Sequence, residues 1–239
     1  MFNFIKADIL RVLKKKSYIV LSAIVLLAYA ATLLIVLSKN PASVELVSGL
    51  LATGAVLLIG IPVFIGVFSD DFHSKAMQTI IGFGTSRRRL VLSRYCEYLV
   101  ILAQAFAVIS LVSLLLFAVT GNMAVAKPIF RDLWKEYLST VLCVGAAMII
   151  VYGAQNTTFG LVIFIGLAAN ILDLLLTGIS FIPFFANHNI DVSLILPSNM
   201  LNQAMSNGKP IFYLFAALCY IVLPLVLSVK LFEKKELEF

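Results

Sequence analysis

Long apolar runs separated by short polar intervals dominate the hydropathy pattern of this 239-residue chain. Six of the runs have about the twenty residues that a helix needs to cross roughly 30 Å of hydrocarbon at about 1.5 Å per residue. We expect spanning helices at about residues 18–38, 46–69, 98–120, 136–153, 158–178 and 211–229. The pattern therefore predicts an all-α polytopic membrane protein with six transmembrane helices, forming a single domain over residues 1–239.

The first 17 residues predict an amphipathic helix in the plane of the membrane interface. Apolar residues recur there at three- and four-residue steps, and cations fill much of the remaining surface. The apolar positions are Phe2, Ile5, Ile9, Val12 and Leu13, and the cations are Lys6, Arg11, Lys14, Lys15 and Lys16. Such a helix buries its apolar face and holds its cations near anionic headgroups. A solvated basic tail that only sets topology is the alternative.

The longest polar interval, residues 70–97, predicts a short helix, a glycine turn and a basic cluster. Four apolar residues at spacings of four, five and eight share one helix face. They are Phe72, Ala76, Met77 and Ile80. Gly82 and Gly84 are expected to end this helix, and Ser86 stands where it can cap the next helix, just before three arginines. This arrangement suits a docking element better than a catalytic loop.

A more broken segment, residues 179–210, separates the last two predicted spans. It begins apolar, turns polar and then becomes mixed, with prolines at positions 183 and 197. No part of it is long and apolar enough to span. We expect short re-entrant or interfacial helices there, on the outer side of the membrane.

Composition and charge sharpen this interpretation. The chain is 62% hydrophobic and 13% charged, whereas soluble domains are about half apolar and a quarter charged. The net charge of +6 lies next to the apolar spans, so membrane topology explains it better than nucleic-acid binding. Thirteen of the eighteen Lys and Arg lie in the N-terminal segment, residues 70–97 and the C-terminal tail. The positive-inside rule places these three segments, and both termini, in the cytoplasm.

Chemical motifs are sparse. The sequence contains no phosphate-binding loop, GxSxG or HExxH pattern, so we expect a non-catalytic chain that binds no cofactor or metal. Cys96, Cys143 and Cys219 are widely spaced and are expected to be buried thiols.

Three polar residues within the spans are candidates for a substrate pathway or gate. Intramembrane polar groups are costly and often functional, which singles out Asp173, Asn170 one turn earlier, and Gln104. The alternative is that Asp173 is an interfacial residue near the outer end of its helix.

In layout and in one local motif, the chain resembles the type-2 permease family of ATP-binding-cassette (ABC) exporters. Family members carry an acid, an aromatic and a basic residue after span two, then a short helix, a glycine, Ser-Arg and Leu-Ser-Lys. Here these elements read Asp71-Phe72-His73, Met77 to Ile81, Gly84-Thr85-Ser86-Arg87 and Leu92-Ser93-Arg94. Lys75-Ala76 departs from the Gly-Thr that many members have, which leaves the subfamily open.

The resemblance implies that residues 70–97 contain a coupling helix, which docks on a cytoplasmic ABC ATPase subunit that holds ATP and Mg. The docking residues it implies are Asp70, Asp71, Phe72, Ala76, Met77, Ile80, Arg87 and Arg88. It further implies a second permease, identical or related, surrounded by membrane lipid, in a plasma membrane that is bacterial by analogy. The expected cargo is a hydrophobic or amphipathic peptide, antibiotic or lipid-like molecule.

Two other functions are compatible with the sequence. A secondary transporter or channel would work on an ion gradient without an ATPase, although the sparse intramembrane charges argue against it. A membrane immunity or sensor subunit, or a membrane enzyme, would retain its function when ATP hydrolysis is blocked.

Overall fold

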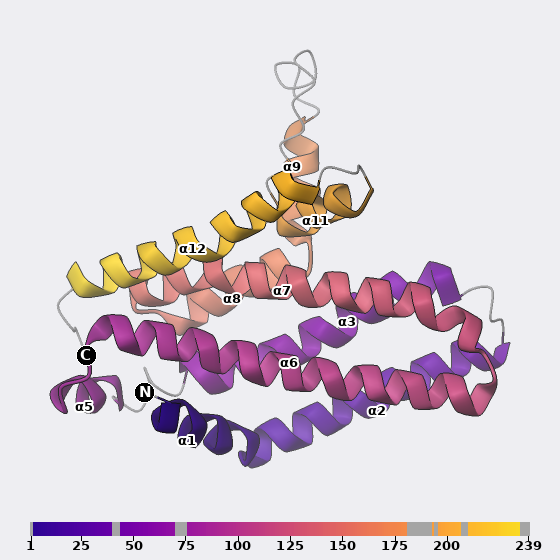
Figure 1. Cartoon of the computed structure of the whole chain (residues 1–239), viewed down its shortest axis with the longest axis horizontal. Helices are drawn as coiled ribbons and strands as arrows, with labels where there is room; N and C mark the ends of the chain where they lie inside the picture. The colour runs from indigo at the N-terminus through magenta and orange to yellow at the C-terminus, as the bar shows by residue number, and fades with distance from the viewer. Residues whose placement is uncertain are drawn as a thin grey trace. The chain divides into compact units, whose positions relative to one another are not determined.

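The computed structural model describes residues 2–39, 44–69, 76–180, 193, 196–206 and 210–234, and it is helical throughout its elements. The elements are α1 (Phe2–Leu13), α2 (Lys16–Lys39), α3 (Val44–Phe64), the π-helix η2 (Ile65–Ser69), α5 (Ala76–Gly82), α6 (Arg87–Thr120), the 3₁₀ helix η3 (Met123–Val125), α7 (Ala126–Ala154), α8 (Thr157–Ala168), α9 (Ile171–Ser180), α11 (Pro197–Ser206) and α12 (Pro210–Lys234). Figure 1 shows their order along the chain.

Five helical stretches of the described residues are long and apolar enough to cross a membrane. They are Lys16–Ser38, Leu51–Phe68, Arg87–Thr120, Met123–Ala154 and Phe215–Lys234. The predicted class, a multi-pass helical membrane protein, is confirmed at this level. Five of the six predicted spans correspond to these stretches.

The predicted fifth span is not one continuous helix. The chain breaks at Ala169 and Asn170, so α8 has 12 residues and α9 has 10. At about 1.5 Å per residue, neither piece covers 30 Å of hydrocarbon by itself. Asn170 has a positive φ of 57°, a left-handed conformation that asparagine tolerates better than most residues and that a continuing helix does not allow.

Two helices extend further than the apolar runs predict. α6 begins at Arg87 rather than near Tyr98 and runs for 34 residues, about 51 Å at 1.5 Å per residue. Residues 121–135, which lie between two of the predicted spans, are mostly helical because η3 and the first turns of α7 occupy them. Of the predicted segment 179–210, α11 and the last residues of α9 fall within the described structure.

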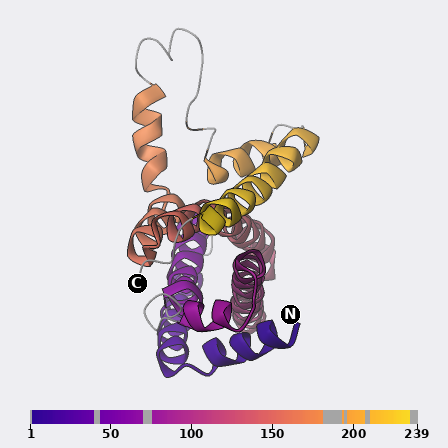
Figure 2. The same cartoon turned by 90° about the vertical axis from the view of Figure 1, so that its left-hand side faces the viewer.

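The described residues form two compact units, one up to Tyr137 and one from Leu138 onward, and α7 contributes to both. In the first unit, α2, α3 and α6 pack on one another, and α1 packs on α2 and α6. Figure 2 shows α1 lying crosswise to these long helices. The Tyr29 hydroxyl and Ser113 Oγ, 2.8 Å apart and buried, join α2 to α6 by a hydrogen bond.

The second unit relies on small residues where helices meet. At Gly145 of α7, an added Cβ would lie 3.0 Å from the Tyr220 carbonyl oxygen of α12. At Gly160 of α8, it would lie only 2.4 Å from a Val151 methyl carbon. Such close backbone approach is typical of packed membrane helices. A short turn follows α7, and Asn156 caps α8 by accepting a hydrogen bond from the Phe159 N–H at 2.9 Å.

The end of α3 contains a local distortion. Pro62 lies inside α3, and the wider π-helical turn η2 follows three residues later. Proline lacks the N–H that a helix interior needs, and π-turns are often found at functional sites. Helix α1 packs against η2 at Gly66. A Cβ added at Gly66 would lie 3.1 Å from Val12 Cγ1 of α1, and Val12 is fully buried.

Replacing Gly66 with leucine is therefore expected to displace α1. Overpacking of a closed contact destabilises by about 1–3 kcal/mol. Unfolding of the purified protein in detergent should show a lower midpoint for Gly66→Leu. Gly54→Leu is the matched control, because a Cβ at Gly54 meets nothing within 4 Å. Equal effects of the two substitutions would contradict a specific α1 contact at Gly66.

Candidate functional site

A buried cluster of charges joins α1 to the first turns of α6. Arg94 Nη1 lies 2.6 Å from Asp8 Oδ2 and 2.6 Å from Glu97 Oε2. The Arg94 and Glu97 side chains are 1% exposed, and the Asp8 side chain is 15% exposed. Charges so far from water persist when they are paired at hydrogen-bond distance.

Among the described residues, a second cation joins this cluster. Arg11 approaches the second oxygen of the same carboxylate, with Arg11 Nε 3.6 Å from Asp8 Oδ1. Two guanidinium groups thus face two carboxylates, which lowers the penalty of burying them. Because Asp8 belongs to α1 and the other buried partners belong to α6, the cluster fixes where α1 crosses the bundle.

Helix α5 places one apolar side chain inside the structure and another outside it. Met77 is fully buried, and Ile80 and Ile81 are partly buried. Phe83, at the turn after α5, is 85% exposed, more than any other large hydrophobic residue in the described structure. Met77 is therefore enclosed in the described structure, whereas Phe83 presents its ring at the surface.

The turn from α5 to α6 is short and well defined. Phe83 N–H donates to the Thr79 carbonyl at 3.0 Å, and Gly84 adopts a left-handed φ of 87°, which only glycine reaches without strain. The predicted cap is confirmed: Ser86 has extended backbone angles, and its Oγ accepts from the Arg89 N–H at 3.4 Å. Figure 1 shows α5 beside the start of α6.

Arginine side chains flank this turn. Arg88 and Arg89 are exposed, and Arg87 is partly exposed. We call Thr79 to Arg89 the α5–α6 tip: an exposed aromatic ring on a tight turn, followed by cations on the first turn of a long helix. Aromatic and arginine side chains are the residue types most enriched at protein interfaces.

Other predicted docking residues fall differently. Asp70, Asp71 and Phe72 lie outside the described residues. Ala76 is the first residue of α5, and its side chain is not described.

The predicted pathway residues do not form one described site. Gln104 is exposed on α6 in the first unit. Asn170 and Asp173 belong to the second unit and lie on either side of the α8–α9 break. Asn170 Oδ1 is buried and has no hydrogen-bond partner among the described atoms, whereas the Asp173 side chain is not described.

A second buried acid lies in the first unit. Glu136 of α7 is 7% exposed, and the Thr53 side chain of α3 hydrogen-bonds to it. Close by in the sequence, Trp134 and Tyr137 pack at tilted angles against Phe106 of α6, with ring centroids 5.7 and 4.9 Å from the Phe106 ring. This group ties α7 to its neighbours, and it brings no nucleophile or metal-ligand set with it.

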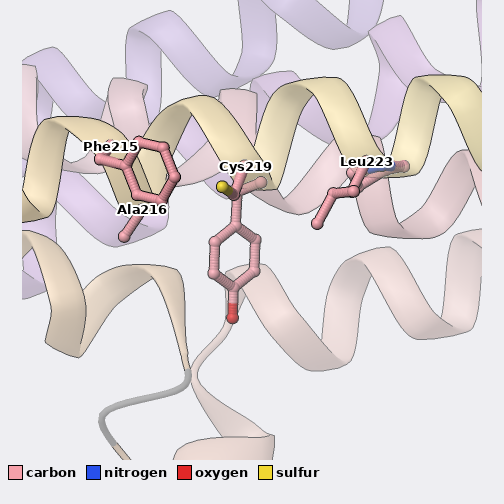
Figure 3. A pocket seen from close by; sticks show the side chains of 6 residues that line it. Phe215, Ala216, Cys219 and Leu223 are labelled. Atoms are coloured by element: carbon pink, nitrogen blue, oxygen red, sulfur yellow. The ribbon is translucent and has the colours of Figure 1, made fainter.

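Cavities and thiols add little chemistry. A cavity of about 420 Å³ runs along α12 and is lined by Phe215, Ala216, Cys219, Tyr220, Leu223 and Pro224; Figure 3 shows four of these side chains labelled. None of these six residues is charged, so the groove suits hydrocarbon.

The expectation of three buried thiols is wrong in part: Cys143 is buried, Cys219 is half-buried and Cys96 is exposed. Across the described residues, no group of three His, Cys, Asp or Glu could hold a metal ion.

No protein-family model and no curated protein sequence match this chain. The resemblance to ABC permeases rests on the motif and the layout alone.

Sequence reasoning overlooked two features of this site. Asp8 is the only acid in the first 44 residues, and such isolation within a basic, amphipathic helix signals a specific partner. Arg94 and Glu97 stand three apart, the spacing of one helix face. The exposed position of Phe83 was not predicted, because the glycines on both sides of it indicate only a turn.

Replacing the buried Arg94 should lower the stability of the protein far more than replacing an exposed arginine. Arg94→Ala removes the cation that lies 2.6 Å from both Asp8 and Glu97, and breaking a buried ion pair by removing one partner typically costs about 3–5 kcal/mol. Unfolding in detergent measures the loss. The control is Arg131→Ala, which removes a 67% exposed partner of Asp132 and should cost less than about 1 kcal/mol.

A triple variant isolates the electrostatic cause. Asp8→Ala, Arg94→Met and Glu97→Leu together remove the three least exposed charged groups of the cluster and leave only Arg11, which is 43% exposed, and stability should recover by much of the Arg94→Ala loss. A triple variant as unstable as Arg94→Ala would mean that packing, not charge pairing, is what Arg94 supplies.

Proposed function

We propose that this chain is the membrane-spanning permease subunit of an exporter driven by a separate ATPase. The observation that carries the proposal is the α5–α6 tip. It presents an 85% exposed phenylalanine beside exposed arginines at the start of a 34-residue helix. An exposed aromatic ring costs solubility unless a partner covers it, and a rim of cations around an apolar centre is the usual anatomy of a protein interface.

The backbone at the tip supports a mechanical role. Four residues separate the end of α5 at Gly82 from the start of α6 at Arg87, and the Ser86 cap and Gly84 turn fix the path between them. A displacement of α5 is therefore transmitted to the start of α6 through a short connection of defined conformation. Helix α6 continues for about 51 Å at 1.5 Å per residue, long enough to carry that movement across the membrane.

The charge cluster supports the same proposal. Arg94 lies only two turns into α6 and holds α1 through Asp8. Movement of the tip would therefore carry α1 with it, and the π-turn η2 beneath Val12 offers a backbone that can adjust. In this scheme the tip, the start of α6 and α1 move as one body.

The remaining parts of the proposal follow from the same scheme. The chain carries no nucleotide-binding motif, so ATP and Mg belong to the partner subunit. One bundle lines half of a pathway, and a second permease completes it. The cargo is hydrophobic or amphipathic, in keeping with the apolar residues that line the groove on α12.

Docking through the tip predicts a localised loss of association. Phe83→Asp should abolish capture of the proposed ATPase partner, because a carboxylate replaces the apolar centre of the interface. Co-purification of the two subunits measures this. Val119→Asp is matched in exposure, at 82%, but lies at the other end of α6, and should leave association unchanged. Unchanged association for Phe83→Asp would refute docking through this residue.

The proposal also requires the tip to face the cytoplasm. In a cysteine-free background, Arg88→Cys should resist an impermeant maleimide in intact cells and react after lysis. Met123→Cys, which is 54% exposed near the opposite end of α6, should react in intact cells. Labelling of Arg88→Cys from outside would contradict the orientation, and with it the ATPase partner.

A further inference from the structure

One amide side chain lies on the outer surface of a long apolar helix. Gln104 is exposed on α6, whereas Ile101 and Ile109 on the other side of the helix are buried in the first unit. Among the described residues, none forms a hydrogen bond with the Gln104 side chain. The five helical stretches that could cross a membrane contain no other asparagine or glutamine. Gln104 is therefore an exception on a surface that is otherwise suited to lipid.

The Gln104 amide lies well inside the part of α6 that hydrocarbon surrounds. The apolar run of this helix covers about residues 98–120. At about 1.5 Å per residue, Gln104 lies about 9 Å from one end of that run and about 24 Å from the other. Hydrocarbon offers neither a hydrogen-bond donor nor an acceptor, so a polar group exposed to it is costly. An amide in this position requires a polar partner.

The side chains around Gln104 leave room for a second helix. Ala103 and Ala107 are both exposed on the same face, and two small residues four positions apart let the backbones of membrane helices approach closely. Val100 and Leu111, which are 49% and 58% exposed, extend this face in both directions. Positions 100, 104, 107 and 111 are four, three and four residues apart, the spacing of a seam between two helices that cross at a small angle.

The chemistry of the amide selects a second copy of this chain as the partner. A glutamine side chain carries both a donor, Nε2–H, and an acceptor, Oε1. A two-fold axis places the same surface patch of two copies face to face. The Nε2 of each Gln104 then donates to the Oε1 of the other, and both amides are satisfied. Residues 98–120 contain no charged side chain, so nothing beside the amide complements a charged partner.

We propose that two copies of this chain associate in the membrane along the exposed face of α6, with the two Gln104 amides paired at its centre. Ala103 and Ala107 allow the approach that brings the amides within hydrogen-bond distance. The two α6 helices are parallel, because both copies have the same orientation in the membrane. This inference rests on the proposed function only in naming the second permease as another copy of the chain. The association itself requires a membrane-spanning α6 and no ATPase.

Energy transfer between full chains that carry a donor or an acceptor fluorescent protein at the C-terminus measures the association in phosphatidylcholine vesicles. Gln104→Leu should weaken it about tenfold, because leucine keeps the volume and removes both hydrogen bonds. Gln104→Asn keeps the amide and should retain most of the association. The control is Thr32→Val on α2. Thr32 is also exposed, but its hydroxyl already donates to carbonyl groups of its own helix, so association should not change.

Disulfide formation locates the interface. In a cysteine-free background, Ala107→Cys should form a cross-linked dimer on oxidation with copper phenanthroline. Leu27→Cys, which is 69% exposed on α2, should not. Equal cross-linking at the two positions would overturn the interface in favour of random collision. Unchanged association of Gln104→Leu with a lower unfolding midpoint in detergent would also overturn it, because the partner of the amide would then lie within the same chain.

Capture of the ATPase in parallel separates this inference from the proposed function. Chains that capture the ATPase but do not associate through α6 would overturn the α6 interface alone. Chains that associate through α6 but capture no ATPase would support the interface and contradict only the docking proposal.

Discussion

The buried guanidinium of Arg94 is the constraint on which the rest of the first unit depends. Its charge cannot remain away from water without partners, so α1 must bring Asp8 to it and Glu97 must stay on the same face of α6. That requirement turns α1 crosswise to the long helices. Val12 then lies on Gly66, and the chain must bend at Lys14 and Lys15 to enter α2.

The same constraint organises the surface. With α1 fixed, the corner before α2 lies against Pro62 and the π-turn, and a small polar-to-apolar cavity remains between them. The start of α6 is held rigidly, so the short turn from α5 presents Phe83 outward on a stable base. The position of the proposed docking tip therefore depends on the position of α6.

Besides the contact of Val12 with Gly66 in the first unit, the two units show different kinds of close helix contact. The first uses polar contacts between helices: the Arg94 cluster, the Tyr29–Ser113 hydrogen bond and the Glu136–Thr53 contact. The second uses small residues, with Gly145 against the Tyr220 carbonyl and Gly160 against Val151. In hydrocarbon, apolar burial does not favour one helix pairing over another, so close approach and internal hydrogen bonds must supply the specificity. These residues fix which helices meet.

The sequence by itself determined the class, because twenty-residue apolar runs have few other stable structures, and it determined the cap at Ser86 and the turn at Gly84, because those are local backbone preferences. It also located the polar segment from which the docking proposal arose. Only the tertiary structure decided that Met77 points inward and Phe83 outward, that Asp8 meets Arg94 across 86 positions of chain, and that the fifth apolar run breaks at Asn170. These outcomes depend on which helices pack together, and hydropathy periodicity carries no information about the partner of a helix face.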